Sequence, residues 1–202
     1  MREPDEQLVR RYLDGDRDAF TTLVERHEAR LYNVCLRILG SPEDAHDATQ
    51  DAFLTVLRKL DQFRGDAAFT TWMHRVAVNA CYDLLRKRKR QPMLRLVTDV
   101  ETDRMEDLGP PVSDPADAVA SGIDVVRALA QVPEDFRVVL VLADVEDLPY
   151  DEIARVLGVP IGTVKSRVHR GRVALARAMG LDSSIGDSGE PRPTAPASEE
   201  ER

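Results

Sequence analysis

Cysteine is scarce in this sequence, with two residues among 202, and neither belongs to a CxxC pair or a cluster with histidine. A disulfide framework and a built-in zinc site are therefore not expected. Cys35 and Cys81 both fall among apolar residues in helical patterns. Free cysteine is among the most buried residue types, so we expect two buried thiols without a metal or redox role.

Long apolar runs are also absent. No stretch approaches the roughly 18 apolar residues that indicate a membrane-spanning helix. The N-terminal sequence MREPDEQLVRRYLDGD is too charged for a secretory signal. Charged residues make up 32% and hydrophobic residues 43% of the chain, which is enough for a core and typical of a soluble protein. We expect a cytoplasmic protein.

No catalytic motif is recognisable. The sequence contains no glycine-rich phosphate loop, no HExxH and no nucleophile elbow, and its four histidines are scattered. His27 lies on an apolar helical stripe with no second ligand nearby, which favours a histidine held by a partner at the core. We expect no enzymatic activity, no cofactor, no metal and no small-molecule substrate.

The most informative stretch that is present spans residues 148–179. Residues 151–157 form a short amphipathic helix, Gly158 ends it, and Pro160 suits the start of another helix. The second helix has an apolar face that includes Val164 and Val168. Its other side and flanks are polar or basic at Thr163, Lys165, Ser166, Arg167, His169, Arg170 and Arg172. This pattern predicts a helix-turn-helix whose second helix enters the major groove of DNA.

Charge is distributed unevenly along the chain. The formal net charge is −8, yet residues 158–180 hold five Lys or Arg and no acidic residue, and residues 61–90 carry a net charge of +4. Residues 91–157 carry −10. Attraction to phosphate is local, so two basic surfaces can bind DNA although the whole protein is acidic.

The first block, residues 1–90, has helical periodicity throughout. We expect helices over residues 5–14, from Asp16 to Gly40, and from Ser41 to about residue 60, with Asp16 and Ser41 as N-caps. The third helix has an acidic side with Asp44, Asp47 and Asp51. Taken alone, such a face indicates simple solvation, and docking of a basic partner is the alternative hypothesis.

A loop over residues 61–71 and a helix over residues 72–90 complete the first block. The loop carries Phe63 and Phe69, and the helix ends in the run RKRKR at residues 86–90. Aromatic rings beside cations are typical of single-strand binding, and the alternative is that Phe69 and Trp72 are core residues, which we slightly favour for Trp72. For residues 86–90 we favour contact with a nucleic-acid backbone.

The remaining segments divide by composition. Residues 91–116 are acidic and rich in proline, which predicts a flexible linker. Residues 117–180 contain two further helices before the helix-turn-helix, and residues 181–202 have the composition of a disordered tail. The expected fold is all-α, with two small helical domains joined by a flexible acidic linker.

Four stretches carry a resemblance to a known family. They are, in chain order, DAFTTLVERHEARLYNVCLRILG, PEDAHDATQDAFLTVLRKLDQFRG, AFTTWMHRVAVNACYDLLRKRKR and LPYDEIARVLGVPIGTVKSRVHRGRVAL, with PEDFRVVLVLADVEDL before the last. The sequence thereby resembles the bacterial RNA polymerase sigma factors of the extracytoplasmic-function (ECF) type, group IV of the sigma-70 family. The resemblance covers nearly all of residues 5–180.

The resemblance implies a role for each block. Residues 1–90 would bind core RNA polymerase and would bind and melt the promoter −10 element, the linker would thread through the polymerase cleft, and residues 117–180 would bind the −35 element. The acidic side of the third helix would dock on the clamp helices of the largest polymerase subunit through Asp44, Asp47, Gln50, Asp51 and Arg58. Contacts to the −10 element would come from Arg64, Asp66, Phe69, Thr71, Trp72, Arg75, Asn79, Arg86, Lys87 and Arg88. The −35 element would be read by the seven polar and basic residues of the recognition helix. An anti-sigma factor would control the protein.

Two other hypotheses stand beside the sigma factor. A dimeric helix-turn-helix regulator acting without core docking would need a dimerisation helix, but the sequence shows no heptad run. A non-DNA adaptor would leave both basic clusters as solvated helix ends, which disagrees with five cations gathered on one recognition helix. The sequence therefore favours a sigma factor that directs promoter recognition, DNA melting and transcription initiation.

Overall fold

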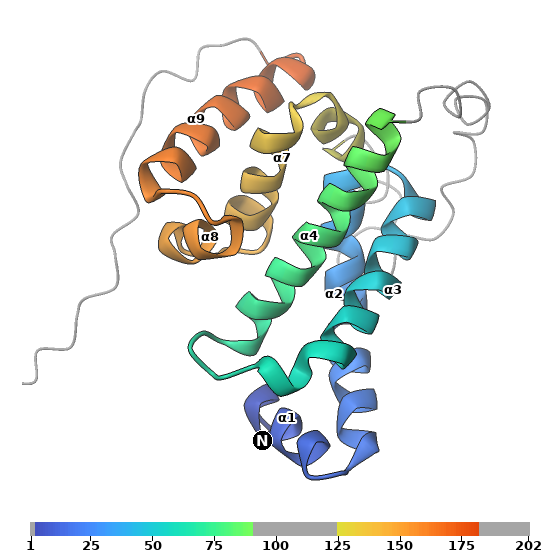
Figure 1. Cartoon of the computed structure of the whole chain (residues 1–202). Coiled ribbons are helices and arrows are strands. Elements are labelled where there is room, and N and C mark those ends of the chain that lie inside the picture. Colours follow the sequence, from blue (N-terminus) through green and yellow to red (C-terminus); the bar gives the residue numbers. More distant parts are fainter. Residues whose placement is uncertain (1–2, 91–124, 182–202) are drawn as a thin grey trace, which may run out of the picture.

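The computed structural model describes residues 3–90 and 125–181, and every regular element in these ranges is a helix (Figure 1). The expected all-α class is therefore confirmed. The predicted linker at residues 91–116 and the tail after residue 181 lie outside the described residues. Among the described helices, none has the length and apolar character needed to cross a membrane.

The first region, residues 3–90, is an antiparallel arrangement of helices. Its elements are α1 (Asp5–Leu13), α2 (Arg17–Leu39), α3 (Pro42–Lys59), the short 3₁₀ helix η1 (Leu60–Gln62) and α4 (Phe69–Arg90). Both predicted N-caps are confirmed. The Asp16 carboxylate accepts a hydrogen bond from the amide of Asp18 at 3.1 Å, and the Ser41 hydroxyl accepts one from the amide of Asp44 at 3.3 Å.

Helix α4 begins at Phe69, three residues earlier than the polar composition of the loop predicts. The Phe69 side chain is buried, and its ring centroid lies 5.6 Å from that of Phe63 and 5.9 Å from that of Trp72. The Phe69 amide, which has no acceptor within the helix, donates to the Glu6 carboxylate at 3.4 Å. The packing of the aromatic rings and the hydrogen bond to α1 thus stabilise the first turn of α4.

The second region, residues 125–181, contains the helix-turn-helix. Residues 125–131 are helical, and then follow α7 (Glu134–Leu140), the single π turn η3 (Val141–Val145), α8 (Tyr150–Leu157) and α9 (Ile161–Ala178). Gly158 ends α8 with a φ of +65°, a left-handed conformation that favours glycine. The predicted turn between two helices is therefore confirmed.

The two regions pack directly against each other. In Figure 1, α4 runs through the middle, with α2 and α3 on one side and α7, α8 and α9 on the other. Helix α8 contacts α4, while α7 and η3 contact α2. Apolar side chains of both regions belong to one continuous buried cluster. From the sequence we expected two separate DNA-binding blocks joined by a flexible linker. The core that the two regions share was not predicted.

Candidate nucleic-acid and protein interfaces

Helix α9 is held by a narrow apolar seam. Val164 and Val168 are buried, together with Ile153 of α8. Gly171 lies against α7 so closely that a Cβ atom there would be 2.8 Å from Cγ of Leu140. These contacts fix the orientation of α9 and leave its opposite side open.

The exposed side of α9 contains the cations predicted to read DNA. Five of the seven side chains predicted to read DNA are exposed, and we call four of them the recognition face: Lys165, Ser166, His169 and Arg170. The Ser166 hydroxyl donates to the main-chain oxygen of Thr163 at 3.0 Å, and Thr163 itself is half-buried. No acidic side chain of the described residues forms an ion pair with Lys165 or Arg170, so both cations are available to an anionic ligand.

Two further arginines of the predicted set are engaged within the second region. Arg167 forms an ion pair with Asp135 at 3.1 Å, and Arg172 forms one with Asp144 at 2.7 Å. The Asp144 contact raises the pKa of Arg172 further above its ordinary value. Both pairs are at least partly exposed, so a phosphate could replace the carboxylates at modest cost. Geometry thus separates a free recognition face from two paired flanking arginines.

A second cation-rich surface lies between α3 and α4. A groove of about 710 Å³ is lined by Asn79, Arg86 and Lys87 of α4 and by Arg58 and Lys59 of α3, with Asp51 and Asp83 also on its wall. We call it the basic groove. The structure therefore brings together three residues of the predicted −10 set. It also places Arg58, which the resemblance assigned to polymerase docking, beside them.

The other members of the predicted −10 set lie elsewhere. Arg64, Asp66 and Arg75 are exposed outside the lining of this groove. Phe69 is buried, and Trp72 is half-buried with its ring centroid 5.6 Å from that of Phe63. Thr71 is buried and donates a hydrogen bond to Glu152 of α8 at 2.5 Å. In this arrangement the aromatic residues support the fold, and their contact with bases stays a prediction.

Arg88 joins three elements of the first region. Its guanidinium forms an ion pair with Asp44, near the N-terminus of α3, and donates to the main-chain oxygen of Leu39 at 3.3 Å. One residue from the predicted DNA set thus neutralises one residue from the predicted docking set. Sequence spacing contained no signal for this pair.

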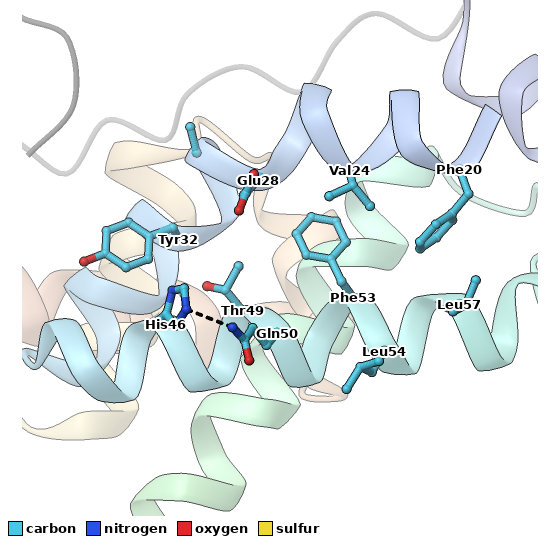
Figure 2. Close-up of a pocket in the computed structure, with 11 residues that line it drawn as sticks. Phe20, Val24, Glu28, Tyr32, His46, Thr49, Gln50, Phe53, Leu54 and Leu57 are labelled. Carbon is cyan, nitrogen blue, oxygen red and sulfur yellow. Dashed lines mark hydrogen bonds between the residues drawn. The ribbon is translucent and has the colours of Figure 1, made fainter. Parts of the chain in front are cut away.

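The outer groove between α2 and α3 is apolar with an acidic edge. Its volume is about 550 Å³, and Figure 2 shows Val24 of α2 and Phe53 of α3 pointing toward each other across it. Leu54 and Leu57 on α3 remain 47% and 38% exposed. Gln50 lines the groove, hydrogen bonded to His46 at 2.8 Å, and Asp47 and Asp51 are exposed on the same helix. We call this surface the docking groove.

Two sequence-based expectations about single residues are confirmed. Cys35 and Cys81 are free and buried. His27 is buried, with Nε2 2.8 Å from a carboxylate oxygen of Asp5. Across residues 3–90 and 125–181, no group of three or more His, Cys, Asp or Glu side chains is placed to hold a metal ion.

The polar contacts between the two regions are the features that the sequence did not predict. Arg30 and His74 of the first region meet Glu146 of the second, and Arg137 reaches back to the end of α2. A possible signal was Arg137 itself, because it interrupts the otherwise apolar run FRVVLVLA. An arginine in such a run must be buried with partners or must break the periodicity.

Comparison with known proteins matches both regions of the chain to parts of one protein family. The model of Sigma-70 region 2 matches residues 23–91, and that of Sigma-70, region 4 matches residues 123–175. The ECF RNA polymerase sigma factor SigM of Mycobacterium tuberculosis is 40% identical over 176 residues, which cover 87% of this chain and 85% of that protein. The ECF RNA polymerase sigma-E factor of Escherichia coli is 36% identical over 176 residues, covering 85% of this chain and 92% of that protein.

Solved structures with a similar fold agree. CnrH in complex with the cytosolic domain of CnrY has a TM-score of 0.65 and 25% identity, covering 90% of this chain and all of that one. The sigma factor RpoE in complex with the anti-sigma factor NepR from Bartonella quintana has a similar fold, with a TM-score of 0.63 and 23% identity over 81% of this chain. With a helix-turn-helix, a basic groove and this identity over most of its length, the chain belongs to the ECF group of RNA polymerase sigma factors.

Proposed function

We propose that this sigma factor binds the promoter −35 element through the recognition face of α9. The supporting observation is that Lys165 and Arg170 are exposed, free of ion pairs among the described residues, and rigidly presented by the buried seam below them. Arginine and lysine can donate two hydrogen bonds to guanine in the major groove, which specifies sequence. We predict that the domain that binds the −35 element spans residues 117–180.

The first region, predicted as residues 1–90, would bind core polymerase and the −10 element. The lining of the basic groove includes Arg58, Lys59, Arg86 and Lys87 together with Asn79, and Arg86 forms an exposed ion pair with Asp83 at 3.0 Å. Four cations provide contacts to phosphates, and an amide can hydrogen bond to an unpaired base. Flipping a base out of the duplex costs a few kcal/mol, which such contacts must offset during promoter melting.

The docking groove is the proposed contact with the clamp helices of the largest polymerase subunit. Exposed leucines at 54 and 57 offer apolar area, and Asp47 and Asp51 lie beside them on α3. A helix with apolar and basic side chains complements such a surface. Asp44 is the least accessible acid of the predicted docking set, because Arg88 already neutralises it.

A protein partner would control this activity. The cytosolic domain of CnrY is bound to CnrH, whose fold is similar over most of this chain. We propose that an anti-sigma factor binds this protein in the same manner, competing with polymerase for it. Sigma factors are initiation factors rather than enzymes, so regulation by sequestration acts on the amount that is free to bind core polymerase.

Reconstituted transcription tests the proposal. Core polymerase is mixed with this protein and a promoter library that varies at the −35 and −10 elements. RNA should start from a defined subset of promoters, and core polymerase alone should give no such product. The proposal is wrong if the protein does not bind core polymerase, or if it protects a palindromic site on its own, as a dimeric repressor or activator would.

A further inference from the structure

Helix α9 carries formal charge of one sign only. It has five Lys or Arg and no acid, whereas the seven Asp or Glu of residues 125–181 all lie between residues 134 and 152. Two of these acids, Asp135 and Asp144, form ion pairs with arginines of α9. The helix that is proposed to bind DNA is therefore partly neutralised by carboxylates of its own region.

The contact between Arg172 and Asp144 is bidentate. Nε of Arg172 donates to Oδ2 of Asp144 at 3.1 Å, and Nη2 donates to Oδ1 at 2.7 Å. A guanidinium presents the same pair of donors to a phosphate, so this carboxylate occupies the position that a DNA phosphate would take. Arg172 follows Lys165 by seven residues and therefore lies on the same side of α9, about two turns farther along.

Close packing of α7 against α9 brings these two side chains together (Figure 1). Gly171, directly before Arg172, approaches Leu140 so closely that a Cβ atom at Gly171 would lie 2.8 Å from Cγ of Leu140. Asp144, in η3, follows Leu140 by four residues, which is about one helical turn. Because the packing of the two helices fixes both backbones, the ion pair forms in the protein without DNA.

The second pair lies on the other side of the recognition face. Arg167 pairs with Asp135, near the start of α7, at 3.1 Å. Arg167 and Arg170 are three residues apart and are neighbours on the surface of α9. The recognition face is thus flanked by one paired arginine on each side. Lys165 and Arg170, which belong to the face itself, form no ion pair among the described residues.

We propose that Asp135 and Asp144 compete with DNA phosphates for Arg167 and Arg172, and thereby keep the affinity of the free protein for DNA of any sequence low. The inference rests on the proposed function, because it concerns the same side of α9. Each acid would act in two ways, since a phosphate must displace it from its arginine and its own charge repels the phosphate. Phosphate contacts carry no sequence information, so the acids would weaken all DNA binding alike and leave base preference to Lys165 and Arg170.

Low affinity for bulk DNA suits a subunit that must first join another protein. Non-specific sites greatly outnumber promoters, and each additional phosphate contact would hold more of the free protein on them. Once the protein is attached to core polymerase, the second region has a high effective concentration near the promoter, which offsets the displacement of the two acids. An exposed ion pair changes an equilibrium by at most about fivefold, so displacement is feasible.

A double-mutant cycle tests the competition at Asp144. The free protein is titrated against a fluorescently labelled duplex that lacks promoter elements, and the affinity is measured by anisotropy. Asp144→Asn should bind about 3–10-fold more tightly than the wild type, because it keeps the shape of the side chain but removes its charge. In the Arg172→Ala background the same substitution should change the affinity by less than about twofold, since no arginine is left to release.

Asp135→Asn with Arg167→Ala forms a second cycle with the same expectation, and it does not depend on the stability of the Asp144 variants. Asp14→Asn is the charge control, because it removes the same charge from an exposed position between α1 and α2. Its affinity for the duplex should match that of the wild type. The melting temperature of each variant verifies that it is folded.

The possible outcomes are distinct. Unchanged affinity in Asp144→Asn and Asp135→Asn would overturn the proposal. An equal gain with and without the paired arginine would also overturn it, because the acids would then act only as general negative charges, and so would an equal gain in Asp14→Asn. The proposed function is judged separately, by promoter selection of the polymerase complex. If that complex with the wild-type protein shows no dependence on the −35 sequence, the proposed function fails.

Discussion

Arg137 of the second region donates a hydrogen bond from Nη1 to the main-chain oxygen of Ile38 at the C-terminal end of α2, at 2.8 Å. The last carbonyl groups of a helix have no donor within that helix, and Ile38 here receives one from another part of the chain. The same guanidinium donates to the main-chain oxygens of Ala130 and Val132, at 2.7 and 2.9 Å from Nη2. One side chain, 7% exposed, therefore satisfies buried acceptors in both regions.

We expect Arg137→Met to destabilise the fold by about 2–4 kcal/mol, since several carbonyls lose a charged donor while the apolar volume is largely kept. Burial already lowers the pKa of Arg137 relative to an exposed arginine, which reflects how little water reaches it. Urea unfolding gives the free energy of unfolding. Arg155→Met, at an exposed pair within α8, should change it by less than about 0.5 kcal/mol. Equal losses in the two variants would contradict this role for Arg137.

The helices and the helix-turn-helix could be predicted because their signals are local. Asp16 and Ser41 bond to amides two or three residues away, and Gly158 adopts its left-handed conformation whatever packs on it. The contact between the regions could not be predicted. Arg30 and Glu146 are 116 residues apart in sequence, and each alone has the pattern of a solvated surface charge.

The sequence predicted which cations are exposed at the site, but it did not predict which of them form ion pairs within the protein. Exposed cations on α9 follow directly from helical spacing, which places Lys165 and Arg170 away from Val164 and Val168. Whether a cation is free depends on acids elsewhere in the chain. Arg88 is paired with Asp44, and this tertiary contact changes what each can offer to DNA or polymerase.

Reversing one charge beside the docking groove should weaken polymerase binding. Asp47→Lys places a cation where the proposed partner is basic, so we expect about a tenfold loss of affinity for core polymerase. The loss should be larger at low salt than at high salt, because salt screens the repulsion. Competition binding against labelled protein at two salt concentrations measures it. Asp14→Lys, an exposed acid between α1 and α2, should leave the affinity unchanged. An equal loss in both variants would indicate a general charge effect instead.

The exposed and the paired arginine of α9 should differ in what they contribute to DNA binding. Arg170→Ala should cost about 1–3 kcal/mol and relax preference at one base pair of the −35 element if Arg170 reads a base edge. Arg172→Ala, whose side chain pairs with Asp144, should weaken binding uniformly across sequences and reduce the salt slope by about one. Promoter competition by the polymerase complex distinguishes the two patterns. A uniform loss in Arg170→Ala would assign that residue to a phosphate.

His27 should make the stability of the first region depend on pH. Burial lowers the pKa of His27 below 6.5, and this effect outweighs the Asp5 carboxylate beside it. The unfolded chain therefore binds a proton at a higher pH than the folded one, so the free energy of unfolding should fall as the pH drops below 6.5. Unfolding at pH 7.5 and 5.5 should show a smaller decrease in His27→Gln than in the wild type. The same decrease in both proteins would attribute the effect to other groups.

Two glycines of α9 provide a matched test of how closely this helix packs. Gly171→Ala would put a Cβ atom 2.8 Å from Cγ of Leu140 and 3.2 Å from the main-chain oxygen of Phe136. The overpacked side chain should cost about 1–3 kcal/mol of stability. This cost should exceed the roughly 1 kcal/mol by which alanine stabilises a helix relative to glycine, so the melting temperature should fall. At Gly162 no atom lies within 4 Å of the added Cβ, so Gly162→Ala should keep or raise the melting temperature by a few degrees. If Gly171→Ala were as stable as Gly162→Ala, α7 would not constrain α9, and the orientation of its recognition face would depend on α8 alone.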